Sequence, residues 1–427
     1  MNRIFALVDC NNFYVSCERL FCASIQNKPV IVLSNNDGCV VARSNEVKKL
    51  HIKMGQPVFE IKDLIEKHKI ILFSSNYSLY ADMSERVMQL LGTFTPEIEV
   101  YSIDESFLNL SHISLEGLQE YGQQIRATVW RFTGIPVSVG IATTKTLTKV
   151  AAEIVKKQPE YLGVLSIAHV AEAELDELLE GIGVEDVWGI GHRYAAALRG
   201  RNIYTARDLK YADPYWIRRH LTVVGARTVL ELRGISCIPL ETKVKPKKGI
   251  MSSKSFGRPI DQLQELEEAI ANYTARAAEK LRDQDSLVLC INVFIQTNAF
   301  QKDAPQYSKS ISKTLPFPTA CTPDLISAAL EALHSIYQPG YSFKKAGVYF
   351  SKIVSQESIQ FDLFGDFTVE GHVKKTKLMC VVDLLNRLLG RDTLFFGAQG
   401  IGREWKMRQE RRSPRYTTQW SELLSTT

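Results

Sequence analysis

The stretch ALVDCNNFYVSCE, from Ala6 to Glu18, places an acidic residue at the end of an apolar segment. Residues 4–8 predict a short buried strand, and a helix is expected from about Asn12 onward. An ionised carboxylate beside a buried strand is costly unless it has a partner. Asp9, which closes this strand, is therefore the first candidate for a functional side chain.

A second acidic position interrupts another apolar region. Residues 99–110 are strand-like on both sides of the adjacent pair Asp104 and Glu105, in the segment YSIDESF. Carboxylates that converge from different strands can hold two metal ions about 3.5–4 Å apart, as two-metal phosphoryl transfer requires. Mg²⁺ suits an open acidic site because it prefers a few hard oxygen ligands plus substrate phosphate oxygens. Ordinary surface carboxylates at strand ends remain the alternative.

The composition predicts a folded protein with several domains. At roughly 100–200 residues per domain, 427 residues predict two to four domains. The net charge of +5 is only a weak indication of a polyanionic partner. The eight cysteines have no C-x-x-C spacing, and no histidine pair completes a zinc pattern. With no signal peptide and no apolar run of about 18 residues, we expect a soluble protein of a reducing compartment.

Further segments predict individual elements. A hairpin is expected over residues 29–43, around the turn signal Asn36-Asp37-Gly38. Helices are expected over residues 79–91 and 145–157. The turn Gly189-Ile190-Gly191 lies between helical stretches and suits a helix-hairpin-helix that presents backbone N–H groups to a phosphate. A simple tight turn is the alternative.

The second half of the chain begins with a basic linker. Residues 243–258 hold six basic residues and no acid. From there to about Ser355 the pattern is strand, helix, strand, strand, helix, strand, which is the ferredoxin-like order, with its first helix over residues 261–282. Beyond Ser355 the chain is expected to be polar and irregular and to end in a basic tail.

Several motifs together resemble one enzyme family. They are the two acidic segments above, VIVLSNNDGCVVAR from Val30, FSSNYSLYADMS from Phe73, VGIATTKTLTKVAA from Val139, VWGIG from Val187 and SPRYTT from Ser413. In combination they resemble the Y-family of translesion DNA polymerases over essentially the whole chain, most of all its UmuC-like branch. The resemblance implies an α+β multidomain right hand with a ferredoxin-like palm. Its expected parts are a palm over 1–170 with inserted small fingers (about 20–76), a helical thumb over 171–240, a ferredoxin-like little finger over 241–355 and a C-terminal tail over 356–427.

The resemblance also implies roles for individual residues. Asp9, Asp104, Glu105 and the backbone carbonyl of Cys10 would hold two Mg²⁺ ions. Tyr14 would be the steric gate that leaves no room for a ribose 2′-hydroxyl. Lys48 and Lys156 would contact the nucleotide phosphates, whereas Asn45 stands where many members have tyrosine, so part of this phosphate clamp is altered. His51 occupies a position that is usually glycine, and histidine tolerates a left-handed backbone better than most residues.

The implied activity is error-prone, low-processivity translesion synthesis in SOS repair and mutagenesis, by a cytoplasmic enzyme that associates with the nucleoid when active. Primer-template DNA and deoxynucleoside triphosphates would be bound. Contacts to the duplex should go to phosphates, because a polymerase must hold DNA without recognising its sequence. Candidate DNA contacts are Gly189, Gly191, Lys245, Lys247 and Lys248. The peptide containing Gln360, Phe361, Leu363 and Phe364 resembles a sliding-clamp motif, and the tail would contact the processed UmuD dimer and RecA.

Two other classes remain open. One is a different two-metal nucleotidyl enzyme on a ferredoxin-like palm, such as a nucleotide cyclase. The other is a non-catalytic DNA-binding or scaffolding subunit of a repair complex. The first would lack a DNA-gripping thumb and a clamp peptide, and the second predicts erosion of the acidic residues, whereas Asp9, Asp104 and Glu105 are all present.

Overall fold

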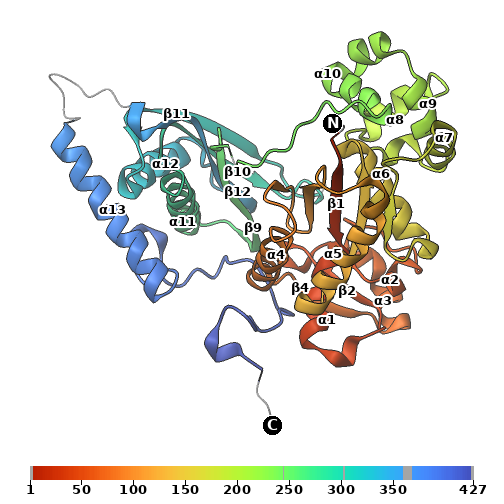
Figure 1. Cartoon of the computed structure of the whole chain (residues 1–427). Helices are drawn as coiled ribbons and strands as arrows, with labels where there is room; N and C mark the ends of the chain where they lie inside the picture. The colour runs from red at the N-terminus through yellow and green to blue at the C-terminus, as the bar shows by residue number, and fades with distance from the viewer. Residues whose placement is uncertain (1–2, 244, 302, 359–367, 425–427) are drawn as a thin grey trace. The chain divides into compact units, whose positions relative to one another are not determined.

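The computed structural model describes residues 3–243, 245–301, 303–358 and 368–424 (Figure 1). The chain forms two compact units. The first comprises residues 1–34, 38–244 and 411–427, and the second comprises residues 35–37 and 245–410. The end of the tail therefore belongs to the first unit, although the rest of the tail belongs to the second.

The first unit is built on a five-stranded sheet in the order β5-β6-β1-β7-β8. Its central strand pairs antiparallel with both neighbours, and the β7–β8 pair is parallel. The strands are β1 (Phe5–Cys10), β5 (Ile98–Val100), β6 (Glu105–Asn109), β7 (Val137–Ala142) and β8 (Val164–Ser166). The helices packed around them are α1 (Phe13–Phe21), α4 (Tyr77–Leu91), α5 (Leu118–Thr133) and α6 (Lys145–Lys157). The predicted first strand and the helix over 145–157 are confirmed.

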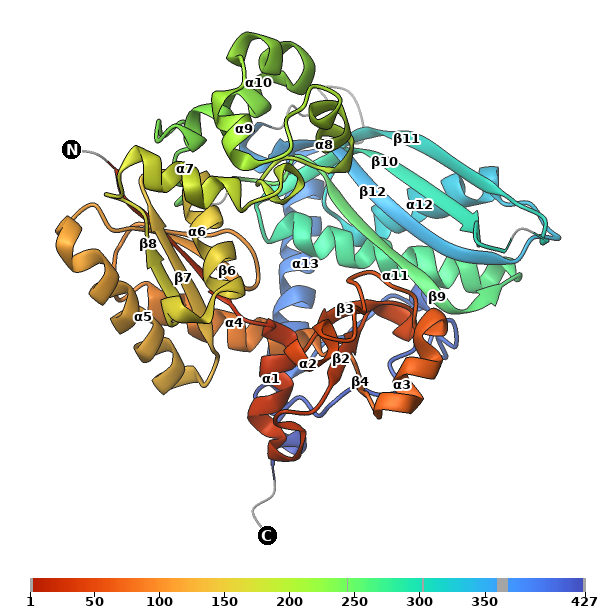
Figure 2. The same ribbon diagram turned by 90° about the vertical axis from the view of Figure 1, so that its right-hand side faces the viewer.

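The alternation of side chains along β1 sorts the helices onto two faces of this sheet. Ala6 and Val8 belong to the core formed with α4 and α5, whereas Leu7 packs with Ala152 of α6 on the other face. Figure 2 shows α5 and α6 on either side of the sheet. Asp9 shares the face of Leu7 because the two are two positions apart in the strand. Gly140 lies opposite Leu7, and a Cβ atom there would come within 2.5 Å of the α6 backbone, so only glycine lets this helix approach so closely.

A smaller sheet in the order β3-β2-β4 extends this unit. It consists of β2 (Val30–Leu33), β3 (Val40–Arg43) and β4 (Ile71–Ser74), with the short helices α2 (Asn45–Lys48) and α3 (Lys62–His68). The predicted hairpin of β2 and β3 is present, but Asn36 and Asp37 adopt the positive φ angles, while Gly38 has φ −83°. His51 has φ 58°, the left-handed backbone expected at this position.

Four helices follow the main sheet: α7 (Glu172–Glu180), α8 (His192–Arg199), α9 (Ala206–Tyr211) and α10 (Pro214–Leu232). Their shared core joins the α6 side of the sheet. The turn before α8 contains Gly189 with φ +88°, a backbone conformation that favours glycine. Gly191 is the N-cap of α8, in extended backbone, with open space where a side chain would lie. The prediction that the turn at Gly189 and Gly191 lies in a helical part of the chain is confirmed by these four helices, whereas its contact with phosphate stays a prediction.

The second unit has the predicted order of strands and helices. Its elements are β9 (Ile250–Ile260), α11 (Leu263–Arg282), β10 (Ser286–Thr297), β11 (Ser308–Thr319), α12 (Thr322–Ile336) and β12 (Phe343–Ser355). The sheet order is β11-β10-β12-β9, all antiparallel. Each helix thus connects two strands that have one strand between them, which is the split β-α-β arrangement.

The expectation of irregular chain beyond Ser355 is wrong. Residues 369–389 form the 21-residue helix α13 (Val369–Leu389), which belongs to the second unit. Arg282 of α11 holds it through two bonds of 2.6 and 2.7 Å to the carboxylate of Asp383. The sequence signal was weak because most of its apolar side chains are exposed, and within α13 only Met379 is buried.

Two further observations concern the described residues as a whole. None of their helices is long and apolar enough to cross a membrane. The eight cysteines all lie within the described residues and are free thiols.

Candidate active site

The register of two neighbouring strands brings the predicted acids together. Asp9 of β1 lies directly opposite Glu105 of β6. One residue further, the N–H of Cys10 donates a 2.8 Å hydrogen bond to the carbonyl oxygen of Asp104. Asp9 precedes the adjacent pair Asp104 and Glu105 by more than ninety positions, yet the three residues meet at one end of the β1–β6 ladder.

The backbone bends before β6, as an adjacent Asp–Glu pair requires if its side chains are to serve different ions. The Ser102 hydroxyl organises this bend. Its oxygen accepts the N–H groups of Asp104 and Glu105 at 3.2 and 3.0 Å, and it donates to Asp104 Oδ1 at 2.6 Å. Asp104 is therefore part of a turn, whereas Glu105 is already in the strand.

Two lysines of α6 cover the carboxylates. Lys156 Nζ lies 2.7 Å from Asp9 Oδ2, and Lys149 Nζ lies 2.8 Å from both carboxylate oxygens of Glu105. The helix begins with the Thr144 hydroxyl accepting the N–H of Leu147 at 3.2 Å. Lys149 and Lys156 are two turns apart on one helix face, with Ala152 between them against the sheet.

Sequence reasoning did not identify Lys149. The available signal was its spacing, since it stands seven residues before Lys156 and so shares a helix face with it. Its ammonium group also lies 4.7 Å from the ring centroid of Tyr101. Lys156 was predicted to contact phosphate. In the structure it is paired with Asp9, so the phosphate role stays a prediction.

The electrostatics of the cluster follow from burial. Burial raises the pKa of Asp9 to about 7; Lys156 opposes this shift, and Glu105 adds to it. Burial and the three nearby carboxylates raise the pKa of the Cys10 thiol well above its usual value. A thiol with a raised pKa is a poor nucleophile, so the Cys10 side chain is not expected to react, and the metal-binding role of its backbone carbonyl stays a prediction.

The acidic residues are of the right type for Mg²⁺, but they are not assembled into a closed site. Among the described residues, no group of three or more histidine, cysteine or acidic side chains is close enough to hold a metal ion. The carboxylates of Asp9 and Glu105, each paired with an ammonium group, and that of Asp104, which accepts the Ser102 hydroxyl, are hard oxygen ligands that fit divalent cations. An open arrangement of this kind suits an ion that keeps substrate oxygens among its ligands.

A pocket of about 690 Å³ is lined by part of this cluster: Asp9 and Asp104 line it, whereas Glu105 does not. Its floor includes Asp9, Cys10 and Asp104, and its wall includes Tyr14. Basic and polar side chains from the smaller sheet and α6 line the rest, namely Arg43, Asn45, Lys48 and Lys156. Burial lowers the pKa of Lys48, and the positive charge of Arg43 lowers it further. The pocket therefore combines an acidic floor with basic walls, which suits a metal-bound polyphosphate.

Tyr14 is held by two aromatic side chains of α4. Its ring stacks on Tyr80, with centroids 4.2 Å apart and an interplanar angle of 17°. Tyr77 meets it edge-on at 6.5 Å and 84°. Such pairs stabilise one ring orientation beyond simple burial of area. The predicted gate residue is thus a fixed wall of the pocket.

The remaining predicted contacts are not among the residues that line this pocket, or they fall outside the described residues. Lys245, Lys247 and Lys248 are exposed, and the backbone of Lys247 is bonded to the side chain of Gln284. Gln360, Phe361, Leu363 and Phe364 lie in 359–367, outside the described residues.

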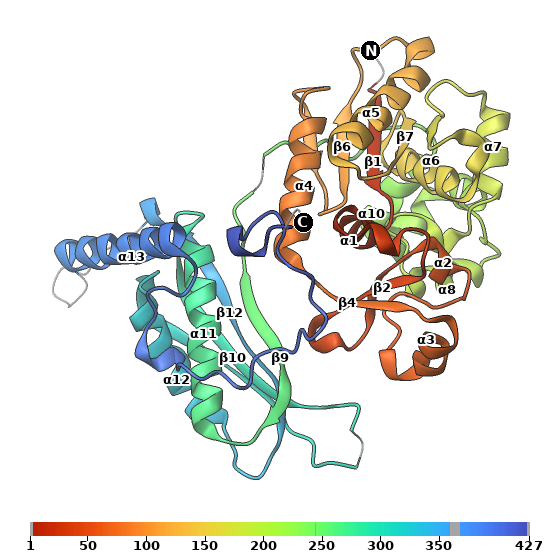
Figure 3. The same ribbon diagram turned by 90° about the horizontal axis from the view of Figure 1, so that it is seen from below.

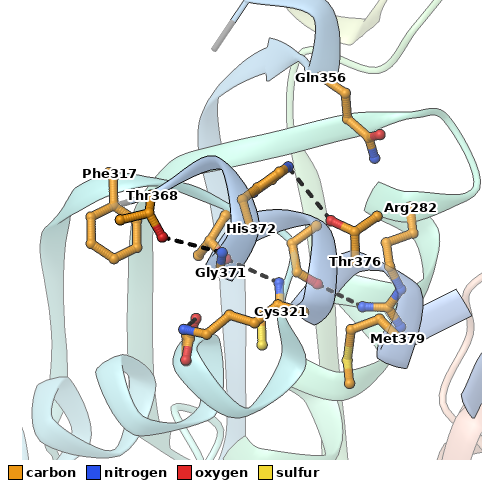
Figure 4. Close-up of a pocket in the computed structure, with 13 residues that line it drawn as sticks. Arg282, Phe317, Cys321, Gln356, Thr368, Gly371, His372, Thr376 and Met379 are labelled. Atoms are coloured by element: carbon orange, nitrogen blue, oxygen red, sulfur yellow. Dashed lines mark hydrogen bonds and ion pairs between the residues drawn. The ribbon is translucent and has the colours of Figure 1, made fainter. Parts of the chain in front are cut away.

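A second cavity, of about 60 Å³, lies in the second unit where α13 meets α12 and the sheet (Figure 4). The Arg282 guanidinium donates to Thr322 Oγ1 at 2.9 Å, and the N–H of Thr322 donates to Met379 Sδ at 3.4 Å. These contacts fasten α13 to its neighbours. The cavity is too small for a nucleotide, so the larger pocket is the candidate active site.

Comparison with known proteins found family matches over most of the sequence. Residues 8–153 match the impB/mucB/samB family, residues 247–363 match the impB/mucB/samB family C-terminal domain, and residues 376–425 match a domain of unknown function (DUF4113). Protein UmuC of Salmonella typhimurium (strain LT2) is 43% identical over 99% of both chains. DNA polymerase IV of Pelotomaculum thermopropionicum is 26% identical over 84% of this chain and 87% of its own.

Among solved structures, a Y-family DNA polymerase chimera of Dbh and Dpo4 has a TM-score of 0.65 at 21% identity, covering 82% of this chain and 99% of that one. This likeness confirms the predicted α+β fold, and the first two family matches together span more than half of the sequence. The chain belongs to the impB/mucB/samB family and is a UmuC-like Y-family translesion DNA polymerase.

Proposed function

We propose that the chain extends DNA primers by two-metal nucleotidyl transfer in the pocket lined by Asp9 and Asp104, with Glu105 opposite Asp9 in the neighbouring strand. The observation that carries this proposal is the β1–β6 register, which places Asp9 opposite Glu105 and the Asp104 carbonyl on the N–H of Cys10. These three side chains and the Cys10 backbone would hold two Mg²⁺ ions. When bound, the ions stabilise the attacking and leaving oxygens of an in-line displacement.

The chain's own residues bind and orient the nucleotide. Lys48, Lys156 and Arg43 line the pocket and supply fixed positive charge for a triphosphate. The Tyr14 ring, fixed by Tyr80 and Tyr77, closes the wall where a sugar would lie and excludes a 2′-hydroxyl. Deoxynucleoside triphosphates are therefore the proposed substrates.

Primer extension tests the metal-ligand assignment. Asp104→Ala should remove Mg²⁺-dependent extension while leaving affinity for primer-template DNA unchanged, because the substitution deletes a ligand and no proposed DNA contact. Glu120→Gln, at an exposed carboxylate on α5, is the matched control and should extend normally. Normal extension by Asp104→Ala would refute the assignment. DNA binding without any extension by the wild-type chain would favour the scaffolding alternative.

The proposed partners follow from membership of this polymerase family and from the sequence motifs. Primer-template DNA would be held through its phosphates by Gly189, Gly191, Lys245, Lys247 and Lys248. The peptide containing Gln360, Phe361, Leu363 and Phe364 would bind the sliding clamp, and deleting Leu363 and Phe364 should abolish clamp stimulation but spare basal extension. Contacts of the tail with the processed UmuD dimer and RecA remain proposals of the same kind.

A further inference from the structure

The end of the tail packs within the first unit, called the catalytic unit from here on. Its contact partners there lie more than 300 positions away in sequence. Figure 3 shows this segment running beside α1 and α4. Ser74, the last residue of β4, donates its N–H to the Arg411 carbonyl at 3.0 Å, and its hydroxyl accepts the N–H of Arg411 at 3.0 Å. Tyr416 stacks on Phe21 of α1, with centroids 4.7 Å apart and an interplanar angle of 12°.

Between these two contacts, Ser413 enters a buried polar site. Its hydroxyl donates to Glu18 Oε1 at 3.0 Å, and the same oxygen accepts the hydroxyl of Tyr80 at 2.6 Å. Asn76 Nδ2 lies 3.0 Å from the Ser413 carbonyl, 2.9 Å from its hydroxyl and 3.0 Å from the Pro414 carbonyl. Glu18, Asn76 and Tyr80 are at most 1% exposed, and Ser413 is 6% exposed.

These contacts satisfy groups that the catalytic unit would otherwise bury unpaired. A buried carboxylate and a buried amide are costly without hydrogen-bond partners. Burial raises the pKa of Glu18, and the bonds from Tyr80 and Ser413 oppose that rise. The tail thus supplies one of the two hydroxyl donors to Glu18 and three acceptor positions around Asn76.

The same residues lead directly to the gate. Asn76 is the N-cap of α4, and its side-chain oxygen accepts the N–H of Leu79 at 3.4 Å. The first turn of α4 carries Tyr77 and Tyr80, the two rings that hold Tyr14. A shift of Ser413 therefore acts on both the start of this helix and the hydroxyl of Tyr80.

We propose that residues 411–416 are an intrachain positioning element for the sugar gate, through which Ser413 and Asn76 fix Tyr80 and hence the ring of Tyr14. This inference rests on the proposed role of Tyr14. It assigns a task to part of the region that matches a domain of unknown function. Undocking the tail should loosen discrimination against ribonucleotides more than it slows insertion of deoxynucleotides.

Single-nucleotide insertion kinetics on the full-length chain test this proposal. For Ser413→Ala, the ratio of kcat/KM for a deoxynucleotide to that for the matching ribonucleotide should fall about three- to tenfold, the range that corresponds to the net contribution of one ordinary intramolecular hydrogen bond. Ser421→Ala, at an exposed serine of the same tail, is the matched control and should keep the wild-type ratio. A general loss of stability would lower both rates equally and leave the ratio unchanged.

Tyr416→Leu is a second test, which can be used if Ser413→Ala fails to fold. It removes the stack on Phe21 without changing a residue of the buried polar site, and it should also lower the ratio. Tyr14→Ala separates this inference from the function beneath it. If Tyr14→Ala loses discrimination while both tail variants keep the wild-type ratio, the positioning role is refuted and the gate stands. If Tyr14→Ala keeps full discrimination, the gate assignment and the positioning role both fall.

Discussion

Replacing Lys145 by methionine should destabilise the catalytic unit severely. Lys145 Nζ lies 2.8 and 2.7 Å from the two carboxylate oxygens of Glu99, and the two side chains are only 2% and 9% exposed. The ammonium group also lies 4.5 Å from the ring centroid of Phe107. With Lys145→Met, the Glu99 carboxylate would keep the backbone N–H of Glu241, at 2.7 Å, as its remaining described donor.

The size of the effect follows from this burial. Removing one partner of a buried ion pair costs roughly 3–5 kcal/mol, because the other charge stays buried without compensation. For a unit of this size, about 2–4 °C of melting temperature corresponds to each kcal/mol, so Tm should fall by roughly 6–20 °C. Lys145 is also the first residue of α6, so this helix, which carries Lys149 and Lys156, should lose order first.

Thermal melting of matched variants measures this effect. Arg86 and Asp82 form a pair with the same 2.8 Å separation but with side chains 55% and 25% exposed, so Arg86→Met should cost only about 0.2–1 kcal/mol. Lys145→Met combined with Glu99→Gln should recover part of the loss, because no charge is then left buried. Equal shifts for Lys145→Met and Arg86→Met would refute the reasoning from burial.

Three further outcomes are expected. Lys156→Ala should raise KM for the nucleotide at least about tenfold with a smaller change in kcat, as steady-state insertion kinetics would show, whereas Lys157→Ala at the exposed neighbour should not. Glu18→Gln should have a higher Tm than the wild type, by a margin that grows as the pH rises above 4.5. The pKa of Glu18 is raised in the folded state, so the wild type loses folding free energy as this carboxyl ionises, whereas glutamine does not ionise. A Tm difference independent of pH would contradict this. Replacing the three exposed linker lysines with alanine should flatten the salt dependence of DNA affinity measured by anisotropy, and an unchanged slope would exclude them as phosphate contacts; they are Lys245, Lys247 and Lys248.

Local pattern was enough to predict the elements that carry the site. The apolar run before Asp9 and the helical spacing of residues 145–157 predicted β1 and α6, and the order of elements predicted the second unit. These predictions succeeded because hydrophobic periodicity and helix-capping residues act over a few neighbouring positions. Local pattern failed at α13, whose apolar side chains are mostly exposed and therefore show no stripe.

By itself, the sequence determined which residues could do the chemistry: the acids Asp9, Asp104 and Glu105, and the tyrosine five residues after the first of them. Only the tertiary structure decided their partners. The pairing of Lys149 with Glu105, and of Ser413 with a carboxylate 395 positions away, depends on strand register and on how a helix and a tail pack against the sheet. Such pairings carry no local signal, because burying a polar group is costly unless it is hydrogen-bonded, and only the assembled fold brings the bonding partners together.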